Sequence, residues 1–264
     1  MDQTTGFARN DRRRAVERLS QFIAKSVDEA RGVEKPFFHL EFDRVFPDDI
    51  YAQILNLMPD KDDYRPMHGR SKAQDENPTR VKIDLFPEYI RNLPAEKRAF
   101  WDVVGRALCS DPVRQAFIRR LEPGLSKRFG KDFAATGMYP IPILTRDIPG
   151  YKITPHTDTR WKGITVQLYL PRDDANTDIG TIFHDVLPDG SKPKHTQMRF
   201  APNSGYAFAV GDDTWHSADA VHDRVKSRDS ILLTYFVDSG VLKILRNRGK
   251  RVGNFVLNEI RHLI

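Results

Sequence analysis

The chain has 264 residues, of which 39% are hydrophobic and 10% aromatic, a composition that excludes a disordered protein and allows a sizeable core. Its apolar runs fall far short of the roughly 20 residues of a membrane span, and its single cysteine, Cys109, excludes an internal disulfide or a cysteine-based zinc site. The first residues contain no apolar stretch typical of a secretory signal, so we expect a cytoplasmic protein.

Positive charge is concentrated near the C-terminus. The formal net charge is +6, and residues 241–264 contain six basic residues and one acidic residue. A basic segment can bind nucleic acid or an anionic surface, but a solvated amphipathic helix is the more common use of this pattern. We therefore expect a basic C-terminal helix over residues 239–264 and no nucleic-acid partner.

The first half of the chain has mainly helical periodicity. Apolar residues recur at helical spacing between residues 16 and 30, and either Asn10 or Asp11 can cap that segment. The extended run PFFHLEF follows, and the polar residues 60–80 predict a loop because they show no periodicity. Three further helices are expected, over residues 47–58, 100–108 and 111–121.

After about residue 133 the pattern changes to short strands separated by Gly, Pro, Asn and Asp. The expected strands are MYPIPIL, YKITPH, ITVQLYLP, GTIFHDVL, QMRFAP, YAFAVG and ILLTYFVD. Closely spaced strands without helices between them indicate a sandwich or barrel. We therefore expect a single α+β domain over residues 1–264, with mainly helical support over 1–132, a β-roll core over 133–238 and the C-terminal helix over 239–264.

His156 and Asp158 are the first candidate site residues. They follow a Pro-Gly turn and the run YKITP, and residues i and i+2 of a strand point to the same face. The triplet alone decides nothing, because about one such pair is expected by chance in a chain of this composition. The best third ligand is His216, which also follows a β-like run and a Gly-Asp turn. Two histidines and one carboxylate form the facial triad of non-haem Fe(II) oxygenases.

Arg228 and Ser230 add a second candidate group. They open the run ILLTYF twelve residues after His216, and strand alternation directs both side chains to the same face. A guanidinium and a hydroxyl placed together can bind a carboxylate, the arginine through a bidentate fork.

Four segments together carry a family resemblance. They are HTDTRWKGITVQLYLP, Gly180-Thr181, FAPNSGYAFAVGDDTWHSA and RDSILLTYF. In this order they resemble the Fe(II)/2-oxoglutarate-dependent dioxygenases, in particular the prolyl-hydroxylase-like superfamily, over residues 136–238. The resemblance implies a double-stranded β-helix core of the jelly-roll or cupin-like kind, braced by N-terminal helices. It also implies Fe(II) as the metal, 2-oxoglutarate as cosubstrate and O2 as oxidant.

The resemblance further implies roles for individual residues. The Fe(II) ligands would be His156, Asp158 and His216. Arg228 would pair with the distal carboxylate of 2-oxoglutarate, assisted by Ser230, and Tyr169 would donate a hydrogen bond to that carboxylate. Gln167 lies on the same strand face as Tyr169 and could also touch the cosubstrate. Arg146 would line the opening of the site, but it is equally well explained as a surface charge.

The implied reaction is hydroxylation of an unactivated C–H bond with release of succinate and CO2. Asp158 favours hydroxylation, because related halogenases lack this carboxylate. We expect four loops to form the mouth of the roll, over residues 60–80, 159–163, 172–179 and 186–196. Their charged residues favour a polar small-molecule substrate, such as an amino acid, a peptide-like or sugar-like metabolite or a natural-product intermediate. The sequence does not indicate the oligomeric state.

Several alternatives stay open. Two are enzymes: a hydroxylase of protein side chains, and a zinc hydrolase with the same three ligands, which would leave Arg228 and Ser230 without a role. Two are not enzymes: a non-catalytic cupin-like binding protein, and a protein in which the His156–Asp158 pair is purely structural. His39 and Glu41 form a competing His-x-carboxylate pair, but no third ligand follows them in a β context. The other histidines are expected to be surface or packing residues, with His184 the one to examine for proximity to substrate.

Overall fold

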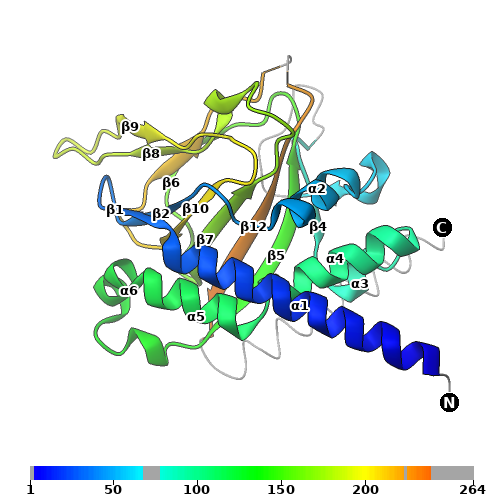
Figure 1. The fold of residues 1–264 in the computed structure, drawn as a ribbon. Coiled ribbons are helices and arrows are strands. Elements are labelled where there is room, and N and C mark those ends of the chain that lie inside the picture. The colour runs from blue at the N-terminus through cyan, green and yellow to red at the C-terminus, as the bar shows by residue number, and fades with distance from the viewer. Residues whose placement is uncertain (1–2, 68–77, 223–224, 239–264) are drawn as a thin grey trace.

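The computed structural model describes residues 3–67, 78–222 and 225–238 (Figure 1). The basic segment 239–264, for which the sequence predicts a helix, lies outside the described residues, as do residues 68–77 of the predicted polar loop. A large and a small β-sheet form the core, and the long helices lie along one side of the large sheet (Figure 1). The predicted α+β class is confirmed.

The helices predicted before residue 133 are present, with shifted ends. The first helix starts at Gln3, well before Asn10 and Asp11, so neither of these residues caps it. The sequence pattern does not predict α3 or α6, which are short and have a proline in the first turn. The α-helices are α1 Gln3–Glu29, α2 Asp48–Asn56, α3 Pro87–Ile90, α4 Ala95–Leu108, α5 Asp111–Arg120 and α6 Glu122–Phe129, and the 3-10 turns are η1 Lys61–Asp63, η2 Phe133–Ala135 and η3 Thr177–Ile179.

The strands form two antiparallel sheets. The large sheet has the order β1-β2-β10-β7-β12-β5-β4-β3, and the small sheet has the order β6-β11-β8-β9. The strands of the large sheet are β1 Arg31–Val33, β2 His39–Phe42, β3 Arg65–Pro66, β4 Arg80–Asp84, β5 Met138–Asp147, β7 Lys162–Tyr169, β10 Gly205–Ala209 and β12 Arg228–Val237. Those of the small sheet are β6 Ile153–His156, β8 Ile182–His184, β9 Lys194–Gln197 and β11 His216–Ala218.

The N-terminal half contributes strands as well as helices. β2 pairs with β10 at one side of the large sheet, and β4 pairs with β5 at the other. The β-roll is thus extended at both edges by segments that precede residue 133, where the sequence pattern is mainly helical. This extension positions the site, because β4 brings Arg80 beside the strands of the core.

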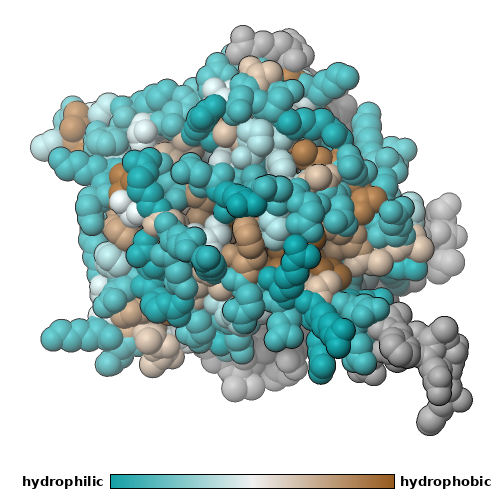
Figure 2. All heavy atoms as spheres, in the orientation of Figure 1, coloured by the Kyte–Doolittle hydropathy of each residue, from teal (hydrophilic) through white to brown (hydrophobic). Residues whose placement is uncertain are grey.

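The core has two layers. One cluster of buried apolar side chains lies between the helices and the outer face of the large sheet, and it includes Trp101, whose Nε1 donates a hydrogen bond to the Leu57 carbonyl at 2.7 Å. A second, aromatic-rich cluster lies between the two sheets, with Phe183 packed edge-on against Tyr206. Figure 2 shows the side of the molecule that faces the viewer covered mainly by hydrophilic residues. No described helix has the length and apolar composition needed to cross a lipid bilayer.

Candidate metal and cosubstrate site

His156, Asp158 and His216 lie together between the two sheets. His156 ends β6 and His216 begins β11, and the two residues are directly opposite each other in this antiparallel pair. Asp158 lies in the loop just after β6, so the strand does not extend through the whole motif. One ligand atom from each of the three residues lies within 4.8 Å of those of the other two.

Backbone hydrogen bonds orient both imidazoles. Nδ1 of His156 lies 3.0 Å from the Thr154 carbonyl oxygen, and Nδ1 of His216 lies 3.0 Å from the Thr214 carbonyl oxygen. A carbonyl only accepts hydrogen bonds, so each Nδ1 carries the proton and each Nε2 carries the lone pair. This is the usual way in which a protein fixes the tautomer of a metal-binding histidine. The donor set fits a divalent iron ion.

The electrostatic surroundings keep Asp158 and His216 in the protonation states that metal binding requires. Burial opposes ionisation of Asp158, but Lys162, His216 and a hydrogen bond from Thr165 outweigh it and lower the pKa of Asp158 to about 2. Lys162 Nζ lies 2.5 Å from one carboxylate oxygen, and Thr165 donates to the other at 2.6 Å. Burial lowers the pKa of His216 to about 4, so at neutral pH this histidine is uncharged and the aspartate is ionised.

The three residues line a small buried cavity of about 50 Å³ whose lining also includes Arg228. Arg228 is 3% exposed and donates to Asp147 Oδ2 from Nε at 3.1 Å and from Nη2 at 2.9 Å. Its Nη1 donates to the Ile179 carbonyl at 2.5 Å. The cavity therefore joins a candidate metal centre to a buried guanidinium, as the sequence predicts.

The other predicted cosubstrate contacts form a hydrogen-bonded network beside Arg228. Gln167 lines the cavity and donates to Ser230 Oγ at 2.8 Å. Tyr169 is buried and bonds to Thr181, accepting from its backbone N–H at 2.8 Å. Tyr206 lines the cavity, unlike Tyr169, and its hydroxyl donates to Thr181 Oγ1 at 2.9 Å. Burial raises the pKa of both tyrosines, so both hydroxyls stay neutral.

Arg146 lies away from this cavity. It pairs with Asp229 at 2.6 Å, stacks over the ring of Tyr64, and lines a different cavity. Arg146 and Asp229 are opposite each other in β5 and β12, one row further along the strands than Asp147 and Arg228. Since neighbouring rows of a sheet point to opposite faces, the position of Asp147 on the cavity side directs Arg146 to the other side.

Sequence reasoning assigned no role to several residues of the cavity. Among them are Arg80, Tyr151 and Tyr206. Tyr206 could have been found from strand alternation in YAFAV, but Arg80 has no local signal, because only the pairing of β4 with β5 brings it to the site. The competing pair is structural: His39 is fully buried, its Nδ1 lies 2.8 Å from the Phe37 carbonyl, and it packs against Phe183.

His184 is also held within the fold. Its two ring nitrogens lie 2.9 Å from the Lys192 carbonyl oxygen and 2.7 Å from Ser217 Oγ. His184 is therefore a neighbour of the cavity wall, since Ser217 lines the cavity and His184 does not.

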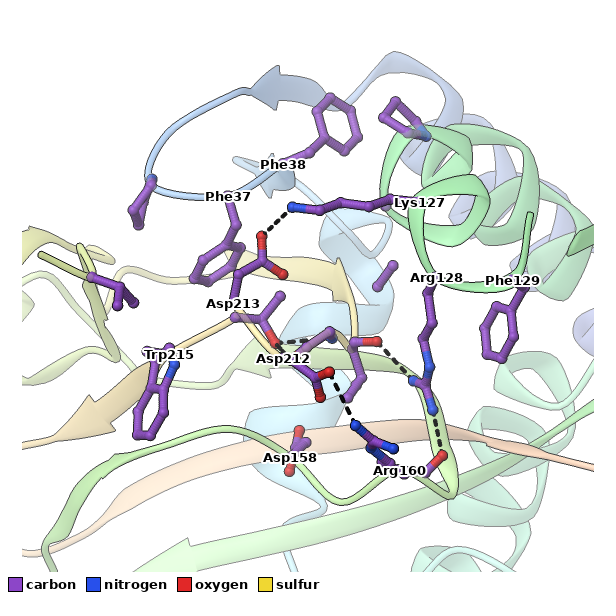
Figure 3. Close-up of a pocket in the computed structure, with 18 of the residues that line it drawn as sticks. Phe37, Phe38, Lys127, Arg128, Phe129, Asp158, Arg160, Asp212, Asp213 and Trp215 are labelled. Atoms are coloured by element: carbon purple, nitrogen blue, oxygen red, sulfur yellow. Dashed lines mark hydrogen bonds and ion pairs between the residues drawn. The ribbon is translucent and has the colours of Figure 1, made fainter. Parts of the chain in front are cut away.

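A much larger groove of about 880 Å³ meets the candidate metal ligands at Asp158, which lines both this groove and the buried cavity. Figure 3 shows Asp158 at the lower end of the groove and Phe38 at the upper end. Ion pairs cross its walls, with Lys127 Nζ 2.7 Å from Asp213 and an Arg160 nitrogen 3.1 Å from Asp212 (Figure 3). The further groove walls come from α6, from the β1–β2 connection and from the segment before β11.

No family model matches the sequence, and no curated protein matches it. A solved prolyl hydroxylase from Trichoplax adhaerens, in complex with a hypoxia inducible factor peptide fragment, aligns with 84% of this chain and 90% of its own, with a TM-score of 0.50 and 10% identity. A prolyl-4-hydroxylase from Pseudomonas putida aligns with 82% of this chain and 100% of its own, with a TM-score of 0.48 and 16% identity.

The first of these alignments shows the fold. This chain has the jelly-roll fold of a prolyl hydroxylase, and the predicted double-stranded β-helix core is confirmed. At 10% identity the alignment does not extend to activity or substrate. Those follow from the chemistry of the side chains in the cavity, because one fold can carry many functions.

Proposed function

We propose that this protein is an Fe(II)- and 2-oxoglutarate-dependent oxygenase. The observation that carries the proposal is one buried cavity lined by His156, Asp158 and His216 and also by Arg228. A facial triad leaves three open positions on an iron ion, and a 2-oxo diacid needs both a metal to chelate and a cation for its distal carboxylate. A zinc hydrolase requires the triad but gives Arg228 no task.

Each group in the cavity has a defined part in this proposal. Iron supplies the oxygen and redox chemistry when it is bound. His156 and His216 present Nε2 to it, and Thr165 holds the carboxylate of Asp158 in place through a 2.6 Å hydrogen bond. Arg228 orients the cosubstrate through its distal carboxylate, and the buried aromatic wall excludes bulk water from the reacting atoms.

The substrate is proposed to enter through the groove that meets the cavity at Asp158. Its volume of about 880 Å³ falls in the range of small-molecule pockets. Its charged residues are largely paired with one another, as in Lys127–Asp213 and Arg160–Asp212, and aromatic and proline side chains line its other parts. This mixture suits a polar small molecule that presents an unactivated C–H bond to the iron, and hydroxylation is the proposed outcome.

Anaerobic titration tests the cofactor assignment. Protein loaded with Fe(II) is expected to develop a weak visible charge-transfer band when 2-oxoglutarate is added. His216→Ala is expected to abolish the band, whereas His195→Ala, which changes a histidine paired with Asp185 outside the cavity, is expected to retain it. Absence of the band in the unaltered protein contradicts the proposal and favours a hydrolase or a binding protein.

A second experiment addresses the substrate. Succinate release is measured with Fe(II), 2-oxoglutarate and O2 while fractions of a metabolite pool are added. Stimulation by a small-molecule fraction is the expected result. Stimulation only by protein or peptide fractions points instead to a protein side chain as substrate.

A further inference from the structure

Three charged residues form one row across the large sheet beside the buried cavity. Arg80 of β4 is directly opposite Asp147 of β5, and Asp147 is directly opposite Arg228 of β12. Residues opposite each other in antiparallel strands project to the same face, so the three side chains meet. Two of them, Arg80 and Arg228, line the cavity that holds the candidate metal ligands.

Asp147 holds both guanidiniums. It is fully buried, and it accepts hydrogen bonds from Nε and Nη2 of Arg80, the latter at 2.7 Å, and from Nε and Nη2 of Arg228. The ring of Tyr151 lies against both guanidiniums, with its centroid 4.1 Å from the Cζ atom of Arg80 and 5.4 Å from the Cζ atom of Arg228. Arg80 is thus fixed as firmly as Arg228 and is only 7% exposed.

One carboxylate cannot neutralise two buried guanidiniums. The remaining charged residues that line the cavity, Lys162 and Asp158, pair with each other. The Arg80–Asp147–Arg228 row therefore carries one unit of positive charge in excess within the described residues. Buried charge without a counterion is costly, and an anionic ligand removes that cost.

Both arginines keep donors for such a ligand. A guanidinium has five N–H groups. Arg80 uses Nε and Nη2 for Asp147, and its Nη1 makes no hydrogen bond to another described residue. Arg228 makes three hydrogen bonds, two to Asp147 and one to the Ile179 carbonyl. Each side chain therefore retains N–H groups without a described partner, and both residues line the cavity.

We propose that Arg80 is a second cosubstrate-binding arginine, so that the distal carboxylate of 2-oxoglutarate is held by Arg80 and Arg228 together, with Asp147 as the buried bridge that spaces them. This inference rests on the proposed function. Arg80 comes from the N-terminal half of the chain, outside residues 136–238, which carry the sequence resemblance. The bracing segment thereby takes part in cosubstrate binding.

The test separates the distal carboxylate from the chelating end of the cosubstrate. Anaerobic Fe(II)-loaded protein is titrated with 2-oxoglutarate and, separately, with 2-oxobutyrate, which keeps the 2-oxo acid but lacks the distal carboxylate. Arg80→Lys keeps a cation beside Asp147 but loses the fork. It is expected to weaken binding of 2-oxoglutarate about 10- to 100-fold, because hydrogen bonds to the charged distal carboxylate are lost. Binding of 2-oxobutyrate, which has no distal carboxylate, is expected to stay unchanged.

The matched control is Arg146→Lys, which changes the arginine one row away on the opposite face and is expected to alter neither affinity. Equal weakening of both ligands by Arg80→Lys overturns the inference, because it indicates a structural role only. Unchanged 2-oxoglutarate affinity in that variant also overturns it and leaves the proposed function intact. Absence of a band with the unaltered protein overturns both.

A second measurement does not depend on a variant that folds. In a crystal structure of the unaltered protein with Mn(II) and 2-oxoglutarate, a distal carboxylate oxygen is expected within hydrogen-bond distance of Arg80 Nη1, about 2.7–3.2 Å. A distal carboxylate that contacts Arg228 alone overturns the inference.

Discussion

His156 and His216 face each other across the β6–β11 pair, with ring centroids 4.4 Å apart, although sixty residues of sequence separate them. A metal held by both histidines would link β6 and β11 of the small sheet. Because an ion that binds only the folded protein stabilises it by mass action, metal loading should raise the free energy of unfolding.

The first prediction concerns that stabilisation. Addition of Mn(II), a redox-stable probe, at one hundred times its dissociation constant is expected to stabilise the protein by about 2.7 kcal/mol. The measurement is the midpoint of thermal unfolding with and without the metal, and EDTA should reverse the shift. His156→Ala should show no shift, whereas an equal shift in this variant would place the metal elsewhere.

The second prediction concerns Asp147. Burial alone would raise its pKa, but Arg80 and Arg228 outweigh burial and hold the pKa below its ordinary value. The stabilising form is therefore the ionised one, present above the unfolded-state pKa of about 4 and lost as pH falls through the lower folded-state pKa. Asp147→Asn is expected to lower the free energy of unfolding by about 3–5 kcal/mol at pH 7, because it leaves buried guanidiniums without their anion.

Urea unfolding between pH 7 and pH 3 checks the sign of this effect. The gap in unfolding free energy between the unaltered protein and Asp147→Asn should narrow below about pH 4. Asp229→Asn serves as the control, because Asp229 pairs with Arg146 and is more exposed than Asp147. Its unfolding free energy at pH 7 should differ less from that of the unaltered protein than the value for Asp147→Asn does. A gap for Asp147→Asn that stays constant down to pH 3 contradicts the prediction.

The third prediction concerns Asn203, which joins the N-terminal half of the chain to the core. Its φ of 58° lies in the left-handed region, which asparagine tolerates better than most residues. Its side chain accepts from the backbone N–H groups of Val45 at 3.1 Å and Phe46 at 2.9 Å and donates to the Phe46 carbonyl at 2.8 Å. Asn203→Ala loses all three bonds and should cost about 3 kcal/mol in urea unfolding.

A conservative variant separates the hydrogen bonds from the backbone conformation. Asn203→Asp keeps the acceptor for the two N–H groups and loses only the donor, so it should be the less destabilised of the two. Equal destabilisation would indicate that the left-handed backbone, and not the side-chain bonds, sets the stability.

The fourth prediction concerns the groove. Phe38 lines it at the end opposite Asp158 (Figure 3). Phe38→Ala is expected to lower substrate-stimulated succinate release about tenfold at low substrate concentration, through lost apolar contact, and to leave the charge-transfer band with 2-oxoglutarate unchanged. Trp161→Ala is the control, because Trp161 is 61% exposed and lies outside the groove lining. A weaker band in Phe38→Ala would mean that Phe38 supports the cosubstrate cavity instead.

Part of the cavity was predictable from local patterns. The His-x-Asp spacing of residues 156 and 158 indicated two ligands, although Asp158 lies in the loop after β6 and not in the strand. Strand alternation applies to Arg228 and Ser230, which both lie in β12. The same rule applied to YAFAV would have indicated Tyr206, whose side chain lines the cavity while that of Tyr169 bonds to Thr181 behind it.

The sequence predicts only part of the position of Arg146. Alternation requires Arg146 and Asp147 to face opposite sides, but it does not say which of the two faces the cavity. The β5–β12 register decides this, because it places Asp147 opposite Arg228 and Arg146 opposite Asp229.

Local patterns in the sequence indicated the four longer helices of the N-terminal half, most of the strands after residue 133, the candidate ligands and Arg228, because each shows short-range periodicity or follows a β-like run and a turn. Only the tertiary structure decided that Arg80 shares Asp147 with Arg228 and that a wide groove reaches Asp158. The physical reason is that pairing between strands distant in the chain results from many weak contacts across the whole core, and no local run of residues encodes it.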